Sequence, residues 1–588
     1  MVRTVLLLCL GLPLAARAYC NAMGPSGYGP RTSKAFPPGW NGLAKTPPRG
    51  WRSWYAYYTH MNQPMIEKAI DALAAKNRTV KGWEGKVSLC DLGYCSAGID
   101  EGWEGCGLGV NGTQHYLNGT PAVNPTLFPD MKGLVDYGHA KGLQMGFYQN
   151  GCGCAEKREP ASGWTIDYEG DAKALAEFGF DAVKFDGCGR LCNLTFQAQL
   201  NQATGKAYTT ENCHWGACTE DDASSCPTAD WCPFNLYRVS GDSDNALGTW
   251  YKNLQQTVRF SSSWDAPLSR PGCWAYPDML QVGRLGCDSR TSGCPPTKEL
   301  LPWTRAHFAA FAIVSSPLVL SIHPSDENLA GILDIIGNKQ ALAINKAWTG
   351  HPGTLVKTLP PATPPVPPVK PGNSAVGVLP NASDTTQTGW RYDSAGHTLR
   401  RGDLCLSCDG KDLPLTLTAC GNSSTFQNFT FDAATGEFHI NAPAGGTALY
   451  PFCLQNVGTG TANKIDAYNC KGSQAQKFAI VAGAGTLCLA DGSSCIAGRD
   501  AYNPPAAGVA GVQWWAKPLG SGRTAALFLN GGSLPYRANI SMAELNATAG
   551  ASAVDVWTGA DAGAVVDGVF DTGVVASLDS RFVVFESK

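Results

Sequence analysis

The segment Lys184-Phe185-Asp186-Gly187-Cys188-Gly189 places a carboxylate where glycines end an apolar run. Side chains alternate between the two faces of a strand, so Lys184 and Asp186 share one face of a strand predicted over 180–186. A cation on that face lowers the pKa of the carboxyl of Asp186 and keeps it ionised, as a carboxylate nucleophile requires. The same spacing also suits an aspartate that caps the start of a helix, and the segment alone leaves both interpretations open.

Two further segments place acids beside aromatic rings, namely Trp274-Ala275-Tyr276-Pro277-Asp278 and Ile99-Asp100-Glu101-Gly102-Trp103. In sugar sites an aromatic ring stacks on the apolar face of a pyranose, and carboxylates accept the hydroxyl hydrogens. The joint occurrence of these segments predicts a carbohydrate site.

The elements that would position these residues alternate between strand and helix patterns. Strands are predicted at 142–148, 180–186 and 313–321, and helices at 171–178 and 303–311. This alternation predicts an α/β fold in which a (β/α)8 barrel with an N-terminal extension covers residues 19–352. Chemistry in such a barrel is expected at the C-terminal ends of the strands.

A proline-rich stretch at 353–375 predicts a semi-rigid linker of polyproline II type. Residues 376–505 then repeat a Cys-Leu pair followed by Gln-x-Phe, as at Cys405 and Gln427 and again at Cys453 and Gln476. This pattern resembles the β-trefoil of ricin-type lectins. Each Gln-x-Phe suits either a core position or a sugar site.

Residues 506–588 alternate apolar runs with Gly- and Ser-rich turns, which predicts a small antiparallel β-sandwich with a structural role.

The beginning of the chain predicts entry into the secretory pathway. Residues 1–18 combine a basic start, a short apolar core and a small-x-small site, as a cleavable signal peptide does. Removing Cys9 with it leaves an even number of the 23 cysteines, so disulfides are favoured over zinc at Cys152/Cys154 and Cys405/Cys408. Glycan acceptor sequences occur at Asn77, Asn111, Asn118, Asn193, Asn381, Asn422, Asn428, Asn539 and Asn546.

The overall composition narrows the class of partner. A hydrophobic content of 44% excludes disorder over most of the chain. A net charge of -3 and the lack of a long basic run argue against nucleic acid as a partner. After signal cleavage no membrane association is expected, and the sequence does not indicate an oligomeric state.

Six motifs in order carry a family resemblance. They are Pro48-Arg49-Gly50-Trp51-Arg52-Ser53-Trp54, Ile99-Asp100-Glu101-Gly102-Trp103, Gly146-Phe147-Tyr148, Lys184-Phe185-Asp186-Gly187-Cys188, Tyr237-Arg238-Val239-Ser240-Gly241-Asp242 and Pro277-Asp278-Met279. In this order they resemble the α-galactosidases of glycoside hydrolase family 27, over about residues 45–352, with a sandwich-like piece at 511–588. The trefoil-like segment would be an insertion between the two usual domains of that family.

The resemblance implies a retaining hydrolase of α-galactosides. Asp186 matches the family's nucleophile, and Asp242, four residues after Arg238, matches its acid/base. Asp244 is the competing candidate for the acid/base. A retaining pair holds its carboxyl groups about 5–5.5 Å apart.

Other matched positions line the sugar pocket in the family. They are Trp54, Asp100, Glu101, Tyr148, Lys184, Arg238 and Asp278, joined by His214, which stands where the family has an acid that contacts O2. The resemblance also implies a disulfide between Cys154 and Cys188 and a mechanism with no metal and no organic cofactor.

Two departures from the family pattern leave the sugar open. The longer side chain of Glu101, where the family usually has aspartate, crowds the C6 end and would favour a β-L-arabinopyranoside. Ala217 follows the trend of relatives that accept N-acetylgalactosamine, whereas His214 does not. A non-enzymatic alternative is a galactose-binding lectin with an inactive barrel.

Overall fold

The computed structural model divides into two compact units, residues 1–360 with 511–588 and residues 361–510. It describes residues 40–151, 154, 164–189, 194–213, 227–229, 232–287, 293–359, 374–380, 390–401, 404–407, 415–420, 427–440, 452–457, 463–470, 472–481, 486–490, 494–498, 512–532, 535–547 and 552–586. The predicted signal peptide 1–18, His214, Ala217 and the side chain of Cys188 lie outside the described residues.

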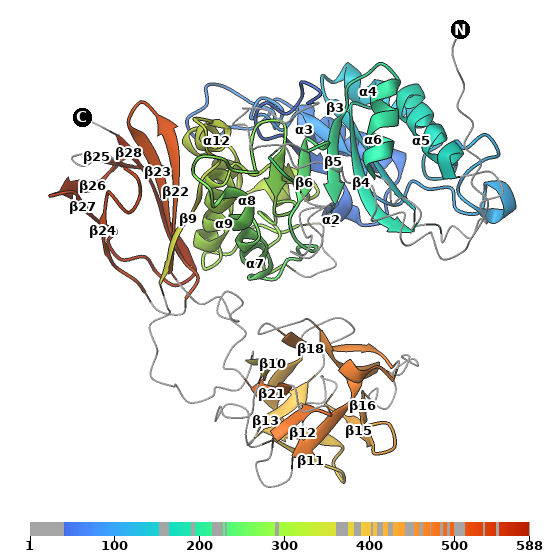
Figure 1. Ribbon diagram of the computed structural model, residues 1–588, viewed down its shortest axis with the longest axis vertical. Coiled ribbons are helices and arrows are strands. Elements are labelled where there is room, and N and C mark those ends of the chain that lie inside the picture. The colour runs from blue at the N-terminus through green and yellow to red at the C-terminus, as the bar shows by residue number, and fades with distance from the viewer. Residues whose placement is uncertain are drawn as a thin grey trace. The chain divides into compact units, whose positions relative to one another are not determined.

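Eight parallel strands form the barrel of the first unit (Figure 1). They are β1 Arg49–Arg52, β2 Ser96–Gly98, β3 Gln144–Gly151, β4 Ala182–Gly189, β5 Thr209–Cys213, β6 Leu236–Arg238, β7 Trp274–Tyr276 and β8 Leu318–Leu320. Each strand pairs in parallel with the next, β8 pairs with β1, and a parallel bridge between Leu280 and Leu320 closes the ring. The predicted barrel is confirmed.

Helices follow most of these strands. They are α2 Trp54–Tyr57, α3 Gln63–Ala74, α4 Met131–Ala140, α5 Trp164–Phe178, α6 Leu194–Ala203, α7 Thr249–Gln255, α8 Val258–Ser261, α9 Leu301–Ile313, α10 Asp326–Leu329, α11 Leu333–Ile336 and α12 Lys339–Lys346.

Helix α3 shows how the local sequence sets an element. The side chain of Asn62 accepts a hydrogen bond from the backbone N–H of Met65 at 3.0 Å and so caps the first turn. Ile66, Ile70 and Leu73 follow at helical spacing and are fully buried. The capped end and the apolar stripe fix this helix against the barrel.

Helix α9 is buried on nearly every side, because it packs against strands of the sandwich as well as against α7, α11 and α12. It extends to Ile313, so the predicted strand over 313–321 is wrong at its start, and β8 begins at Leu318. His307 stacks on Trp250 at 4.7 Å, and burial lowers the pKa of His307 to about 3. The imidazole is therefore neutral and part of the core.

The strands of the C-terminal sandwich are hydrogen-bonded in one continuous order, β24-β27-β26-β25-β28-β23-β22-β9, and neighbouring strands are antiparallel. Its strands are β9 Thr354–Leu359, β22 Val512–Gly520, β23 Arg523–Asn530, β24 Asn539–Ser541, β25 Ser552–Asp555, β26 Asp561–Val566, β27 Val569–Asp571 and β28 Asp579–Glu586. The predicted linker 353–375 is wrong at its start, because β9 pairs with β22 and belongs to this sheet. Leu359 and Val512 are direct partners in that pairing.

The second unit is built from antiparallel strands. They are β10 Ser374–Pro380, β11 Trp390–Asp393, β12 Thr398–Arg401, β13 Leu404–Ser407, β14 Thr416–Ala419, β15 Phe429–Asp432, β16 Glu437–Ile440, β17 Phe452–Val457, β18 Asn463–Asn469, β19 Phe478–Val481, β20 Thr486–Leu489 and β21 Ser494–Gly498. Because β10 begins at Ser374, the linker prediction also extends too far at its end.

The Gln-x-Phe repeats of this unit lie in its interior. Phe429 and Phe478 belong to the apolar core, and the buried amide of Gln427 donates to Ser407 Oγ at 3.0 Å, while that of Gln476 donates to Gln455 Oε1 at 3.0 Å. These contacts support the core interpretation of the repeat. The assignment as a β-trefoil stays a prediction.

Disulfides in this unit join equivalent positions, Cys405 with Cys420 and Cys453 with Cys470. The second bond lies beside His439, but bonded sulfurs are not thiolates, so this group is no metal site.

Of the predicted glycan acceptors, Asn77, Asn111, Asn118, Asn428, Asn539 and Asn546 are described, and all are exposed. No helix among the described residues is both long and apolar enough to cross a bilayer.

Candidate active site

The predicted site residues come from the C-terminal halves of several barrel strands or directly follow them. Asp100 follows β2, Tyr148 lies in β3, Asp186 in β4 and Arg238 ends β6, while Asp278 follows β7. Since the strands are parallel, these ends form one face of the barrel, where barrel enzymes place their chemistry.

Asp186 is held by a tyrosine of the neighbouring strand. The Tyr148 hydroxyl donates to Asp186 Oδ2 at 2.9 Å and accepts from Asn150 Nδ2 at 2.9 Å. Burial, with the nearby carboxylates of Asp100 and Asp186, raises the pKa of Tyr148, so its hydroxyl stays protonated and remains a donor. The carboxylate is only partly buried, so it is oriented and still accessible.

Lys184 binds a different carboxylate from the one expected. Its ammonium donates to Asp100 Oδ2 at 2.8 Å and lies 4.9 Å from the centre of the Tyr148 ring. Burial alone would lower the pKa of Lys184, but Asp100 and other anionic groups raise it above its usual value. The sequence predicts that Lys184 acts on Asp186, whereas the described contact of Asp186 is with Tyr148.

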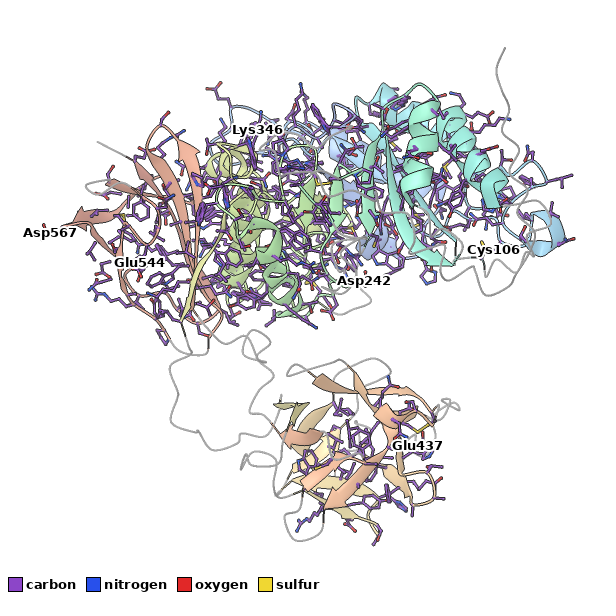
Figure 2. All side chains as sticks on the ribbon, in the orientation of Figure 1. Cys106, Asp242, Lys346, Glu437, Glu544 and Asp567 are labelled. Atoms are coloured by element: carbon purple, nitrogen blue, oxygen red, sulfur yellow. A yellow bond between two sulfur atoms is a disulfide. The ribbon has the colours of Figure 1, made fainter. Side chains whose placement is uncertain are left out.

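Arg238 joins the two acids on the other side of the site. Its Nη2 lies 2.6 Å from Asp242 Oδ1, and its Nη1 lies 3.5 Å from Asp278 Oδ1. Asp278 is fixed in turn by the Tyr55 hydroxyl at 2.8 Å and by the backbone N–H of Ser243 at 2.6 Å. Arg238 and Asp278 are buried, but the side chain of Asp242, which is labelled in Figure 2, is 60% exposed by its solvent-accessible area. Asp242 is therefore held by Arg238 through Oδ1, and most of its side chain is exposed.

Asp244, the competing acid, does a local structural task. Its Oδ1 accepts from the backbone N–H of Ala246 at 2.9 Å and from the hydroxyl of Thr249, the first residue of α7. These contacts fix the turn before the helix and favour Asp242 over Asp244 as the acid/base.

Trp54 begins α2 just after β1 and is partly buried. Its ring meets Tyr58 edge to face at 5.4 Å and packs beside a cluster that includes Tyr55, Tyr276 and Met279. Its place after β1 suits a wall of the pocket.

Two glutamates follow Asp100 in the same loop. Burial, and then the charges of Asp100 and Asp186, raise the pKa of Glu101. Glu104 is buried and accepts from the backbone N–H of Gly102 at 2.7 Å, which fixes the loop that carries Glu101. Burial raises the pKa of Glu104 to about 7.

The shifted Glu104 predicts a pH-dependent stability. A raised pKa means that the folded state favours the protonated form, so this stabilisation is complete below about pH 4.5 and is lost as the pH rises to about 7. The linked loss in the free energy of unfolding is about 3 kcal/mol. We expect the melting temperature to fall over this pH range, and to fall less in Glu104→Gln, which is neutral throughout. Equal falls in the two proteins would contradict the prediction.

The predicted disulfide between Cys154 and Cys188 is wrong. Cys154 is bonded to Cys106, labelled in Figure 2, with the Cα atoms 5.0 Å apart. Cys106 follows β2 and Cys154 follows β3, so the bond ties the loops of two adjacent strands. Cys213, at the end of β5, is a buried free thiol, so an even number of cysteines does not mean here that every one of them is paired.

Sequence reasoning missed three residues of this region. Tyr55 fixes Asp278, and Arg52 and Glu211 form an ion pair at 2.7 Å inside the barrel. The sequence does carry a sign of this ion pair: Arg52 and Glu211 are charged residues in strands that are otherwise buried, and buried charges are almost always paired.

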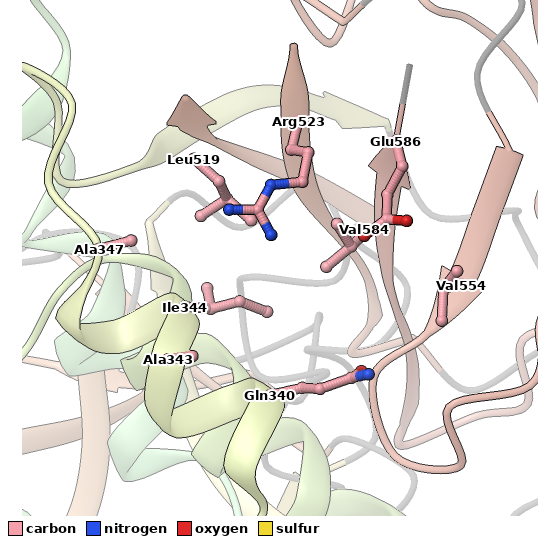
Figure 3. A pocket seen from close by; sticks show the side chains of 9 residues that line it. All are labelled: Gln340, Ala343, Ile344, Ala347, Leu519, Arg523, Val554, Val584 and Glu586. Atoms are coloured by element: carbon pink, nitrogen blue, oxygen red, sulfur yellow. The ribbon is translucent and has the colours of Figure 1, made fainter. Parts of the chain in front are cut away.

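A cleft of about 140 Å³ lies elsewhere (Figure 3). Its lining comes from α12 and the sandwich, with Arg523 and Glu586 as the charged members. It contains none of the predicted site residues.

Comparisons with known proteins match both parts of the first unit. The family model described as Alpha galactosidase A matches residues 46–347. The model described as Alpha galactosidase C-terminal beta sandwich domain matches residues 509–585.

Curated relatives agree with these matches. Alpha-galactosidase 3 of Arabidopsis thaliana is 28% identical over 325 residues, which are 54% of this chain and 64% of that protein. An alpha-galactosidase of Oryza sativa subsp. japonica is 28% identical over 326 residues, or 54% of this chain and 67% of that protein.

Solved structures share the fold at low sequence identity. Alpha-galactosidase I from Mortierella vinacea has a TM-score of 0.53 at 17% identity and covers 93% of this chain and 98% of its own. A β-L-arabinopyranosidase from Geobacillus stearothermophilus has a TM-score of 0.52 at 14% identity, with 93% and 98% covered. Since the first family model spans more than half of the 588 residues, this protein belongs to the α-galactosidase family, glycoside hydrolase family 27.

Proposed function

We propose that this protein is a retaining glycoside hydrolase that releases terminal α-linked D-galactose from oligosaccharides or glycoconjugates. The observation that carries the proposal is a pair of acids held in different ways. Asp186 is oriented by the Tyr148 hydroxyl at the end of β4, and Asp242 is tethered by Arg238 after β6. One acid is preset for attack, and the other is exposed enough to meet a leaving group.

The proposed reaction is a double displacement. Asp242 gives its proton to the glycosidic oxygen while an Asp186 oxygen attacks the anomeric carbon, so the bond to the aglycone breaks and a galactosyl ester forms. Asp242 then takes a proton from water, the water oxygen attacks the anomeric carbon, and the ester bond to Asp186 breaks. Both steps invert the anomeric carbon, so the product keeps its configuration. The two carboxyls supply the nucleophile and the proton transfers, so the mechanism requires no metal or organic cofactor.

Sugar recognition would use the charged groups around this pair. Lys184 and Arg238 donate to ring hydroxyls, Asp100 and Asp278 accept from them, and Trp54 forms the apolar wall. His214 keeps its predicted place near O2 as a proposal.

Three p-nitrophenyl glycosides test the proposal: the α-D-galactopyranoside, the α-N-acetylgalactosaminide and the β-L-arabinopyranoside. We expect kcat/KM to be highest for the α-galactoside, the substrate of the proposed reaction, and the contact between Lys184 and Asp100 supports their proposed role in binding its hydroxyls. Inactivity on all three would overturn the enzyme proposal for these sugars.

A β-L-arabinopyranosidase is the second candidate, and Glu101 is the observation that favours it. Its long side chain is half-buried among acids, where it would crowd C6 of a hexose. In Glu101→Asp the ratio of galactoside to arabinopyranoside kcat/KM should then rise about tenfold, the scale set by one methylene. An unchanged ratio would remove Glu101 as the reason for this candidate.

We further propose that the protein works outside the cytosol, after secretion or delivery to a vacuole or lysosome. Its disulfides support an oxidising compartment. A lectin role for residues 376–505 has weaker support, because Gln427 and Gln476 are turned into the core.

A further inference from the structure

A buried ion pair crosses the inside of the barrel. Arg52 ends β1 and Glu211 lies in β5, and their Nη2 and Oε2 atoms are 2.7 Å apart. In the order β7-β6-β5-β4-β3-β2-β1-β8, three strands separate β1 from β5 on either side of the closed ring. The pair therefore joins opposite walls of the barrel and not neighbouring strands.

Lys184 is the cation placed between this pair and the sugar-binding acids. It is the direct register partner of Glu211, so both side chains point to the same side of the sheet. Its ammonium nevertheless binds Asp100 Oδ2 at 2.8 Å. Arg52 Nη1 lies 4.0 Å from that same oxygen and has no hydrogen-bond partner among the described residues.

These four side chains balance one another in charge. Arg52 and Lys184 carry two positive charges, Asp100 and Glu211 carry two negative ones, and each side chain is at most 12% exposed. In such surroundings an uncompensated charge is costly, so every anion recruits the nearest cation. The pairing of cations with anions therefore decides whether Lys184 stays in contact with Asp100, the acid proposed to bind the sugar.

Removing either Arg52 or Glu211 should change which of the remaining charged side chains contact each other. Without Arg52, Glu211 draws in Lys184, which leaves Asp100. Without Glu211, Arg52 relaxes onto Asp100 Oδ2 and occupies an oxygen needed for a sugar hydroxyl. Both changes damage sugar binding while the Tyr148–Asp186 contact remains.

We propose that Arg52 and Glu211 are positioning residues for sugar binding: by neutralising each other, they keep Lys184 on Asp100. This proposal rests on the proposed function, because it takes Lys184 and Asp100 as ligands of the sugar hydroxyls.

The test is a double-mutant cycle on the α-galactoside. Arg52→Met and Glu211→Gln should each raise KM at least tenfold and change kcat by less than about threefold, since uniform binding is lost and the two catalytic acids remain. The double variant has no unpaired charge, so its KM should return to within about threefold of wild type. A double variant no better than the worse single variant would overturn the proposal.

A matched control separates positioning from stability. Arg78 is another buried arginine, and its Nε lies 2.9 Å from Asp326 Oδ1, an acid that is not among the site residues. Arg78→Met should lower the melting temperature and leave KM unchanged. If Arg52→Met behaves in the same way, with lower stability and unchanged KM, the pair is only structural. If Arg52→Met does not fold, Arg52→Lys, which keeps the charge, and the double variant carry the test.

A crystal structure of Arg52→Met distinguishes failure of this inference from failure of the proposed function. The expected change is that Lys184 Nζ contacts Glu211 instead of Asp100, whatever the substrate is. If the wild type hydrolyses none of the three glycosides, the proposed function fails while the lysine position still decides the inference. A lysine that stays on Asp100 overturns it.

Discussion

Asp186→Asn is expected to abolish hydrolysis of p-nitrophenyl α-galactoside, with kcat reduced on the order of 10⁴-fold or more. Asparagine keeps the size of the side chain and its carbonyl oxygen still accepts from the Tyr148 hydroxyl, which holds Oδ2 at 2.9 Å in the wild type. The amide is a very poor nucleophile, so the first displacement fails while the fold remains. Steady-state kinetics and the melting temperature of the variant measure the two effects separately.

A matched control for this variant lies at the other end of the same strand. Asp181 precedes β4 and is bound by Lys206 at 2.8 Å and by His139 at 2.8 Å. Asp181→Asn should keep kcat close to wild type. Restored turnover of Asp186→Gly by azide, with a β-galactosyl azide as product, would identify the missing group as the nucleophile. More than a tenth of wild-type activity in Asp186→Asn would refute the assignment.

Loss of the acid/base is expected to depend on the leaving group. Asp242→Asn removes the proton donor but keeps an oxygen near Arg238, which lies 2.6 Å from Asp242 Oδ1. For melibiose, whose leaving group is a poorly acidic sugar alcohol, kcat/KM should fall about 10²–10⁴-fold. p-Nitrophenolate leaves without protonation, so kcat/KM for the aryl glycoside should fall much less. A ratio of the two substrates measures this difference.

Asp244→Asn is the control for Asp242, since the sequence leaves both as candidates. Its carboxylate caps the turn before α7 by accepting from the backbone N–H of Ala246 at 2.9 Å. We expect a modest loss of stability and equal, small effects on both substrates. A leaving-group effect in Asp244→Asn and none in Asp242→Asn would exchange the two roles.

The parts of this molecule that follow local rules could be predicted from the sequence. The apolar run before Asp186 ends at glycines, and the structure places that aspartate in the C-terminal half of β4. The barrel and sandwich also follow from alternating patterns. The apolar pattern could not assign Ile313 to a helix or a strand, because a buried helix and a buried strand are equally apolar. Helix α9 takes that residue because both its faces are covered.

Contacts between distant strands could not be predicted in this way. The pairing of Arg52 with Glu211 depends on closure of the whole ring, and alternation says only that each points inward or outward. The partner of Cys154 depends on which neighbouring loop approaches it, and the loops after β2 and β4 both flank the one after β3. The structure resolves this choice in favour of Cys106.

The pairing of Leu359 with Val512 explains why a whole unit can be inserted in the sequence between these two residues. In the sequence, the second unit, residues 361–510, lies between β9 and β22, and these two strands are direct antiparallel neighbours about 5 Å apart. The first and last strands of that unit also pair, with Val376 opposite Gly498, so its insertion between two paired strands costs little loop-closure entropy. A short turn could therefore take the place of residues 361–510 and leave the pairing of β9 with β22 intact.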